Sequence, residues 1–206
     1  MTSQDITYFR DQLIGLLDEK FRKEAVFNAY FRINPNGEII SQGTEKTIND
    51  FGNNKEEIKA ANWFGNYWFY IRISFQFGAD INVLLPFVSV SFFQKTNDSL
   101  KQLFRAEWDS YSPIEGYNHP QPHWHITSHL SDVNSFEALG NEEEENIFNE
   151  LAGNTKSINL DKMHFAMGGN WIASGEMIHQ YKDEHDIVNW MIQLFNHVKE
   201  ELSYKD

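Results

Sequence analysis

Two consecutive apolar runs near the middle of the chain constrain its fold more than any other feature. In YWFYIRISFQF (67–77) large apolar residues occupy every second position, and arginine, serine and glutamine lie between them. Alternation with a period of two is typical of a strand that buries one face. Gly78-Ala79-Asp80 predicts a short turn before a second strand at 81–94, so we expect a β-hairpin. Pro86 in that second strand predicts an edge strand or a bulge, because proline lacks the N–H that a sheet requires.

Helical periodicity is present at both ends of the chain. Residues 3–22 and 183–203 carry apolar side chains at spacings of three and four, which places those side chains on one face of a helix. A second C-terminal helix is expected over 133–152. A short internal helix is expected near Lys55–Ala61, in a stretch that is otherwise polar and mixed.

Shorter alternating segments complete the predicted architecture. Strands are also predicted at 26–33, 103–109 and 122–130, and around 163–165. The first of these ends at Asn34-Pro-Asn-Gly37, a strong turn signal. The whole pattern predicts a single α+β domain over residues 1–206. Its antiparallel meander sheet would have about five strands, with the N-terminal helix and the C-terminal helices packed on one face.

The absence of cysteine narrows the possible chemistry. The 206-residue chain is rich in aromatic residues, at 15%, which indicates a folded globular domain. Because it contains no cysteine, disulfides, thiolate zinc sites and a cysteine nucleophile are excluded. The polar N-terminus MTSQDITYFRDQL does not have the pattern of a signal peptide. The longest apolar stretch, INVLLPFVSVSFF, is shorter than the roughly 20 residues of a membrane span. We therefore expect a soluble cytoplasmic protein without a membrane segment.

The net charge of −13 bears on the choice of partner. An acidic surface disfavours nonspecific binding of nucleic acid, since phosphate neutralisation supplies most of that affinity. Part of the excess lies in Glu142–Glu145, which is either a solvated helix start or a docking surface for a basic partner. We expect a protein partner or a homo-oligomer.

The segment HPQPHWHITSH (119–129) holds four of the eight histidines. If 122–130 is a strand, Trp124 and Ile126 point to one face, and that apolar face belongs in the core. The opposite face then carries His123, His125, Thr127 and His129. The position of His119, which precedes the strand, is not fixed by the alternation.

The strand at 103–109 divides in the same way. Phe104, Ala106 and Trp108 form its apolar side. Its polar side carries Arg105, Glu107 and Asp109. If this strand pairs with 122–130 and both tryptophans enter the core, the carboxylates share a face with the histidines, at cross-strand distances of about 5 Å between Cβ atoms.

Three kinds of chemistry fit these residues. A metal site would use His119, His123 and His125 with a carboxylate, and the missing thiolates leave manganese, iron, nickel or zinc as candidates. Metal-free phosphodiester chemistry would use two histidines as base and acid, with Arg105 and Thr127 binding the substrate. The third is ligand binding without turnover. A strand with several outward histidines is also a common structural feature, in which His–Asp or His–Glu pairs only stabilise the fold.

Two other segments carry candidate histidines. His164 in KMHFAMGGNW is the next candidate histidine, and Gly168-Gly169 beside it indicates a turn rather than a ligand contact. The remaining histidines, which lie near or on the C-terminal helix, are interpreted as surface or packing residues. They are His179, His185 and His197.

The layout LFRAEWDSY…HPQPHWHI, between Leu103 and Leu130, resembles small bacterial proteins encoded near toxin–antitoxin and phage-defence genes, including the TumE-like toxins. The resemblance covers about 30 residues and implies a compact antiparallel sheet and a toxin or defence component acting on nucleic acid or nucleotides. The net charge of −13 suits an accessory subunit better than a free-standing nuclease.

Together these observations predict a histidine-based phosphoester hydrolase that uses His123, His125, Glu107 and Asp109 as its catalytic residues. The pattern leaves the cofactor open, and a divalent transition metal is the candidate. The alternative is a non-enzymatic accessory protein that uses its acidic, aromatic-rich surface for partner contacts.

Overall fold

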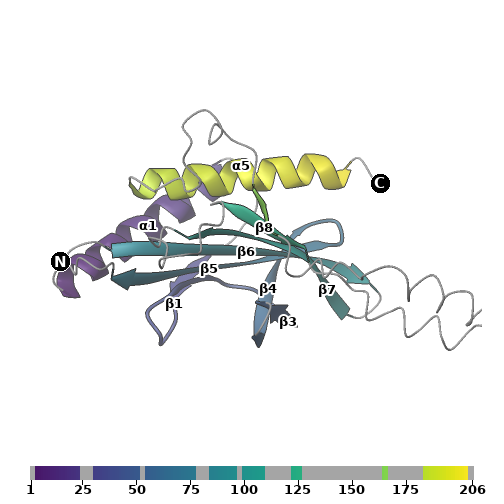
Figure 1. The fold of residues 1–206 in the computed structure, drawn as a ribbon, viewed down its shortest axis with the longest axis horizontal. Helices are drawn as coiled ribbons and strands as arrows, with labels where there is room; N and C mark the ends of the chain where they lie inside the picture. The colour runs from purple at the N-terminus through teal and green to yellow at the C-terminus, as the bar shows by residue number, and fades with distance from the viewer. Residues whose placement is uncertain are drawn as a thin grey trace, which may run out of the picture.

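The computed structural model describes residues 3–23, 30–51, 54–77, 84–96, 99–109, 122–126, 164–166 and 183–203. These residues form two helices and nine strands (Figure 1). In chain order the elements are α1 (Ser3–Lys23), β1 (Phe31–Ile33), β2 (Ile39–Ser41), β3 (Glu45–Asp50), β4 (Lys55–Phe64), β5 (Tyr67–Phe77), β6 (Leu84–Thr96), β7 (Ser99–Asp109), β8 (His123–Ile126), β9 (His164–Ala166) and α5 (Glu184–Ser203).

All strand pairs in the described sheet are antiparallel, in the order β1-β2-β5-β6-β7-β8-β9. One edge of β5 is shared: β2 pairs with it at Arg72 and Ile73, and β4 pairs with it nearer Tyr67. β3 pairs with β4 and extends this branch of the sheet. The α+β class and the predicted hairpin of β5 and β6 are confirmed, but the expected number of about five strands is too small.

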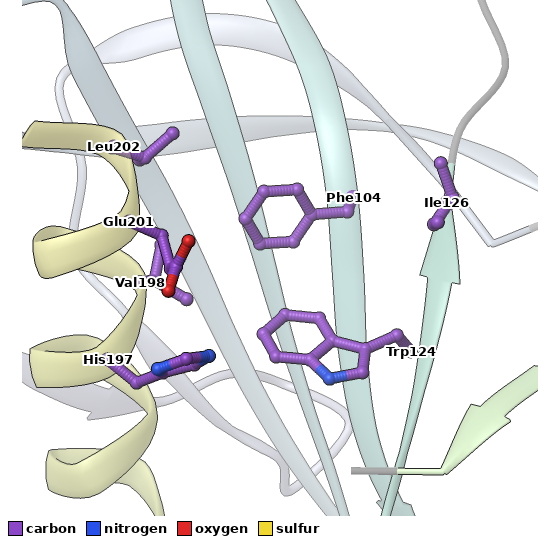
Figure 2. Close-up of a pocket in the computed structure, with 7 residues that line it drawn as sticks. All are labelled: Phe104, Trp124, Ile126, His197, Val198, Glu201 and Leu202. Carbon is purple, nitrogen blue, oxygen red and sulfur yellow. The ribbon is translucent and has the colours of Figure 1, made fainter. Parts of the chain in front are cut away.

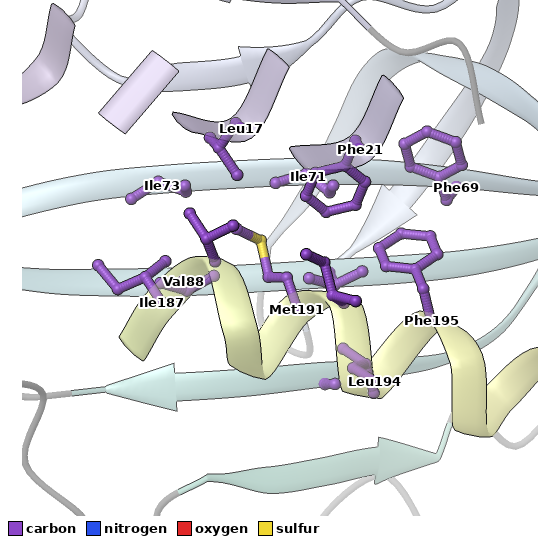
Figure 3. Close-up of a cluster of buried hydrophobic side chains, with 14 of the residues drawn as sticks. Leu17, Phe21, Phe69, Ile71, Ile73, Val88, Ile187, Met191, Leu194 and Phe195 are labelled. Carbon is purple, nitrogen blue, oxygen red and sulfur yellow. The ribbon is translucent and has the colours of Figure 1, made fainter. Parts of the chain in front are cut away.

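Both helices cover the same face of the sheet (Figure 1). Apolar side chains of α1 and α5 meet the alternating residues of β5 and β6 that the sequence assigns to the core (Figure 3). Phe195 of α5 lies at the centre, with its ring 5.7 Å from Phe21, 5.0 Å from Trp63 and 5.1 Å from both Phe69 and Phe92, measured between ring centroids. The predicted helices at 3–22 and 183–203 are therefore confirmed, and their apolar faces form the main core.

The opposite face of the sheet is partly covered by β3, which lies against β7. Thr47 Oγ1 donates to the carbonyl of Leu100 at 3.1 Å, and the Asp50 N–H donates to Gln102 Oε1 at 2.7 Å. A second apolar cluster fills the space between these layers. Its buried members are Ile40, Ile58, Ala60, Tyr70, Phe93 and Leu100.

The expected helix at Lys55–Ala61 is wrong, since these residues belong to β4. Lysine, glutamate and alanine favour helices, which is why the stretch looks helical on propensity alone. In the structure, Lys55–Ala60 pairs residue by residue with β3, and Ile58 and Ala60 turn inward together. Burial and pairing therefore override the propensity.

Pro86 does not mark an edge strand, because β6 lies between β5 and β7. Pro86 pairs with Phe75 of β5, whereas the described pairing with β7 begins one residue later, at Phe87. The missing N–H therefore costs no described bond to β7. The irregularity in the β6–β7 ladder lies elsewhere, between Phe92 and Phe93.

Several smaller predictions have mixed outcomes. The turn after β1 is confirmed, with Gly37 at a φ of 77°. A short strand near 163–165 is confirmed as β9. The predicted helix at 133–152, the turn at 78–80 and the first half of the strand at 26–33 lie outside the described residues, in whole or in part. Neither described helix has an apolar stretch long enough to cross a bilayer.

Candidate metal centre

The pairing of β7 with β8, assumed from the sequence, is present. Glu107 and His123 are direct cross-strand partners, and so are Arg105 and His125. Because side chains alternate along a strand, all four lie on the face of the sheet away from α5. Trp124 lies on the other face, where it packs against the main core, as the alternation predicts.

The polar face continues across the neighbouring strands. Ser89 of β6 pairs with Glu107, and Ser91 pairs with Arg105. Both serines are buried, and among the described residues neither hydroxyl has a hydrogen-bond partner. Tyr70 of β5 pairs with Ser91, and burial, with the nearby Glu56 carboxylate as a lesser cause, raises its pKa to about 12.

Three side chains converge at the β8 end of this face: Glu107, His123 and His125. His125 Nε2 lies 2.6 Å from Glu107 Oε2 and 2.8 Å from His123 Nε2, and His123 Nε2 lies 3.7 Å from Glu107 Oε2. The whole residues His123 and Glu107 are only 1% and 7% exposed. The side chain of His125 is 15% exposed and forms the outer member of the group.

His125 Nε2 makes two short contacts, although a ring nitrogen can form only one hydrogen bond in the ring plane. An imidazole nitrogen offers either one N–H or one lone pair in the ring plane. If it donates to the carboxylate, no lone pair remains for His123, and if it accepts from His123, it faces the carboxylate without a proton. A shared cation removes the conflict, because ligands at right angles around a metal, with bonds of about 2.1 Å, lie about 3 Å apart.

Arg105 fixes the orientation of the carboxylate. Its Nε donates to Glu107 Oε1 at 2.7 Å, which leaves Oε2 directed at the histidines. Its Nη1 donates to the carbonyl of Asp50, and its guanidinium lies 5.2 Å from the centroid of the Phe51 ring. Arg105 is therefore held on three sides at the junction of β3 and β7.

The carboxyl group of Glu107 is ionised despite its burial. Burial alone raises the pKa of Glu107, but the hydrogen bond with His125 and the charge of Arg105, together with the smaller effects of the His125 and His123 charges, outweigh it, so the pKa lies below its ordinary value. An ionised carboxylate beside two imidazoles is a suitable set of ligands for a transition metal. The same three groups without a metal would form a proton-sharing cluster for general acid–base catalysis.

The other expected site residues lie either outside this cluster or outside the described residues. Asp109 pairs with Phe87 at the end of β7 and is not part of the described cluster of ligand atoms. Two residues along a strand separate Asp109 from Glu107 by about 6.8 Å, and β8 begins opposite Glu107. His119 and Thr127 lie outside the described residues. His164 of β9 is the backbone partner of His125.

Sequence reasoning did not assign three residues around this site: Ser89, Ser91 and Asp50. Ser89 and Ser91 alternate with apolar residues in β6, and that alternation could have assigned them to the polar face. The contact of Arg105 with Asp50 had no comparable signal, because β3 was not predicted. The expectation that Arg105 binds an anionic substrate stays a prediction, and its observed partner is Glu107.

The chain was compared with protein-family models, with curated proteins and with solved structures. The resemblance to TumE-like toxins stays a prediction, because it receives neither support nor contradiction from these searches. None of the three comparisons finds a match.

Proposed function

We propose that Glu107, His123 and His125 bind one divalent transition metal, and that the protein uses it to hydrolyse phosphoesters. The observation that carries this proposal is the pair of short contacts made by one atom, His125 Nε2. Two histidines and one carboxylate from adjacent strands match the ligand set of a facial triad, which leaves coordination positions open for water and substrate.

The ligand types restrict the metal. Imidazole suits zinc, iron, nickel and copper, and the chain has no cysteine that would favour a thiolate site. A metal held by these ligands would supply an activated water near neutral pH. The role of this chain would be to keep Glu107 ionised and oriented through Arg105, and to hold both imidazoles with Nε2 toward the same point.

Phosphoesters are the substrate class to test first. The inference rests on a reaction type that a metal-activated water can perform and on the resemblance of the 103–130 layout to defence proteins. The net charge of −13 favours small phosphoesters and nucleotides over polymeric nucleic acid, because a polymer is repelled by an acidic surface.

A metal site without turnover is the second candidate function. The burial of His123 and Glu107 favours it, because structural metal sites are closed to solvent. Against it stands the number of ligands, since structural zinc usually has four protein ligands and the described cluster offers three. The two candidates differ in activity and agree in metal binding.

The direct test is an activity panel with bis-(p-nitrophenyl) phosphate, nucleotides and short RNA and DNA, each with manganese or zinc. We expect hydrolysis by the wild type and none by the His123→Ala/His125→Ala double variant. His185→Ala is the matched control, because His185 is exposed at the start of α5. Equal behaviour of all three proteins would contradict the hydrolase. Metal binding by the wild type without turnover of any substrate would favour the structural site.

A further inference from the structure

The helix-covered face of the same two strands carries a pocket of about 390 Å³. Phe104 of β7 and Trp124 and Ile126 of β8 line one side, and the last turns of α5 line the other (Figure 2). This pocket is on the opposite face of the sheet from Glu107, His123 and His125. Its size falls within the range of small-molecule sites, roughly 300–1,000 Å³.

The walls of the pocket are apolar and partly aromatic. The rings of Phe104 and Trp124 meet edge to face, with centroids 5.1 Å apart, and project toward α5 (Figure 2). Ile126 is 39% exposed, although alternation places it on the apolar side of β8. Val198 is buried and Leu202 is half-buried on the helix side. These surfaces fit a flat apolar group.

The helix side also carries negative charge. Glu201 lines the pocket one helical turn after His197, and Glu200 adjoins it outside the lining. The last turn of α5 has no basic residue. Because the carboxyl end of a helix carries a partial negative charge, two glutamates there are unfavourable unless a cation lies near. Glu201 is therefore placed to bind a positive group at the mouth of an apolar pocket.

We propose that this pocket binds a small amphipathic molecule with a flat apolar body and a cationic head. The body would lie between the Phe104 and Trp124 rings and Val198, and an ammonium group would pair with the Glu201 carboxylate. Contacts of the aromatic rings with a nearby cation would add to the attraction. This site is independent of the proposed metal centre and remains if that centre is disproved.

Three probes share a naphthalene ring and differ in the charge of the head group, so they separate the apolar contribution to binding from the charge contribution. They are 1-naphthylmethylamine, 1-naphthalenemethanol and 1-naphthoate. Binding is followed by the NMR signal of the Trp124 indole N–H, assigned with Trp124→Phe. We expect the amine to bind most tightly, the alcohol more weakly and the carboxylate least. Equal affinity of the amine and the carboxylate, or no shift of the Trp124 signal with any probe, would overturn the proposal.

Paired variants test the location of the charge. Glu201→Gln should weaken binding of the amine about two- to fivefold, the range of an exposed ion pair, and leave the alcohol unchanged. Glu200→Gln removes the same charge beside the pocket and should have little effect. If both variants weaken the amine equally, the preference comes from net charge and the proposal fails.

Filling the pocket tests the apolar walls. Leu202→Trp should lower the affinity of all three probes more than tenfold, and Ile126→Trp does the same from the other wall if Leu202→Trp fails to fold. Unchanged binding in a folded variant would contradict the site. A wild-type dimer in sedimentation that Leu202→Trp dissociates, with no probe binding, would assign the pocket to a second copy of the chain and overturn the proposal.

Discussion

The two faces of the paired strands β7 and β8 are stabilised by different interactions. On the α5 side, Phe104 and Trp124 pack in an apolar layer held by shape and burial. On the other side, Glu107 and His125 are held by a chain of charged hydrogen bonds that ends at β3. The apolar face loses stability when volume is removed, whereas the polar face loses it when a charge is left unbalanced.

The largest effect is expected in the apolar core between α5 and the sheet, from Phe195→Ala. Phe195 is fully buried and contacts four aromatic rings from α1, β4, β5 and β6. The cavity left behind should lower the free energy of unfolding by about 3–5 kcal/mol, measured by urea denaturation. Asn196→Ala, at the next and exposed position, should change it by less than about 0.5 kcal/mol. Equal effects of the two would mean that α5 does not pack as described.

On the polar face, Arg105→Met should lower the free energy of unfolding by about 3 kcal/mol, because it leaves the buried Glu107 carboxylate without its cation. Arg72→Met is the control: Arg72 also pairs with carboxylates, but its side chain is 26% exposed, against 5% for Arg105. It should cost about 1 kcal/mol or less.

Zinc adds a further test of the Arg105→Met variant. Because Arg105 keeps the Glu107 carboxylate ionised and oriented, its loss should weaken zinc binding, so zinc should stabilise Arg105→Met less than the wild type. Thermal shifts with and without zinc measure the difference. Equal shifts in both proteins would mean that the metal does not lie beside this carboxylate.

Two buried serines, Ser41 and Ser89, should differ in how much their hydroxyl groups contribute to stability. The Ser41 hydroxyl accepts the N–H of Ile71 at 2.9 Å, so Ser41→Ala should cost about 1–3 kcal/mol. Ser89 is equally buried, but its hydroxyl has no partner among the described residues, so Ser89→Ala should be nearly neutral. A loss of more than about 1 kcal/mol on Ser89→Ala would show that a bound water or ligand uses this hydroxyl.

The pH dependence of stability tests the charge state of Glu107. Its pKa is lower in the folded state than its ordinary value of 4.5, so its ionisation stabilises the fold above that pH. This contribution is lost as the pH falls below 4.5 and through the lowered pKa. The difference in unfolding free energy between the wild type and Glu107→Gln should therefore shrink in that acidic window. A difference that stays constant there would contradict the lowered pKa.

Local periodicity was sufficient to predict one part of the site. The alternation in 103–109 and 122–130 assigns Glu107, His123 and His125 to one face, and the pairing of these strands brings them together. The same reasoning correctly placed the two terminal helices, whose apolar stripes are long and regular. Patterns of this kind need no knowledge of distant contacts.

The remaining features depend on contacts between distant residues. Arg105 meets the Asp50 carbonyl from 55 positions away, and helix propensity conceals the strand character of β4. Asp109 shows the limit of alternation: it has the right parity, but β8 begins opposite Glu107, so Asp109 lies beyond the described pairing of β7 with β8. Parity assigns a face, whereas register decides which residues meet.

Metal content tests the central claim most directly. Purified protein would be loaded with zinc or cobalt, freed of excess metal by gel filtration and analysed by mass spectrometry. The triad predicts one ion per chain in the wild type and in His185→Ala. The affinity for the metal should fall at least ~100-fold in His123→Ala and in Glu107→Ala. Substituting a residue that only contacts a metal ligand usually lowers metal affinity by about 10- to 100-fold, so a larger loss identifies a ligand. A wild type that retains no metal, or variants that retain as much as the wild type, would contradict a metal centre at Glu107, His123 and His125.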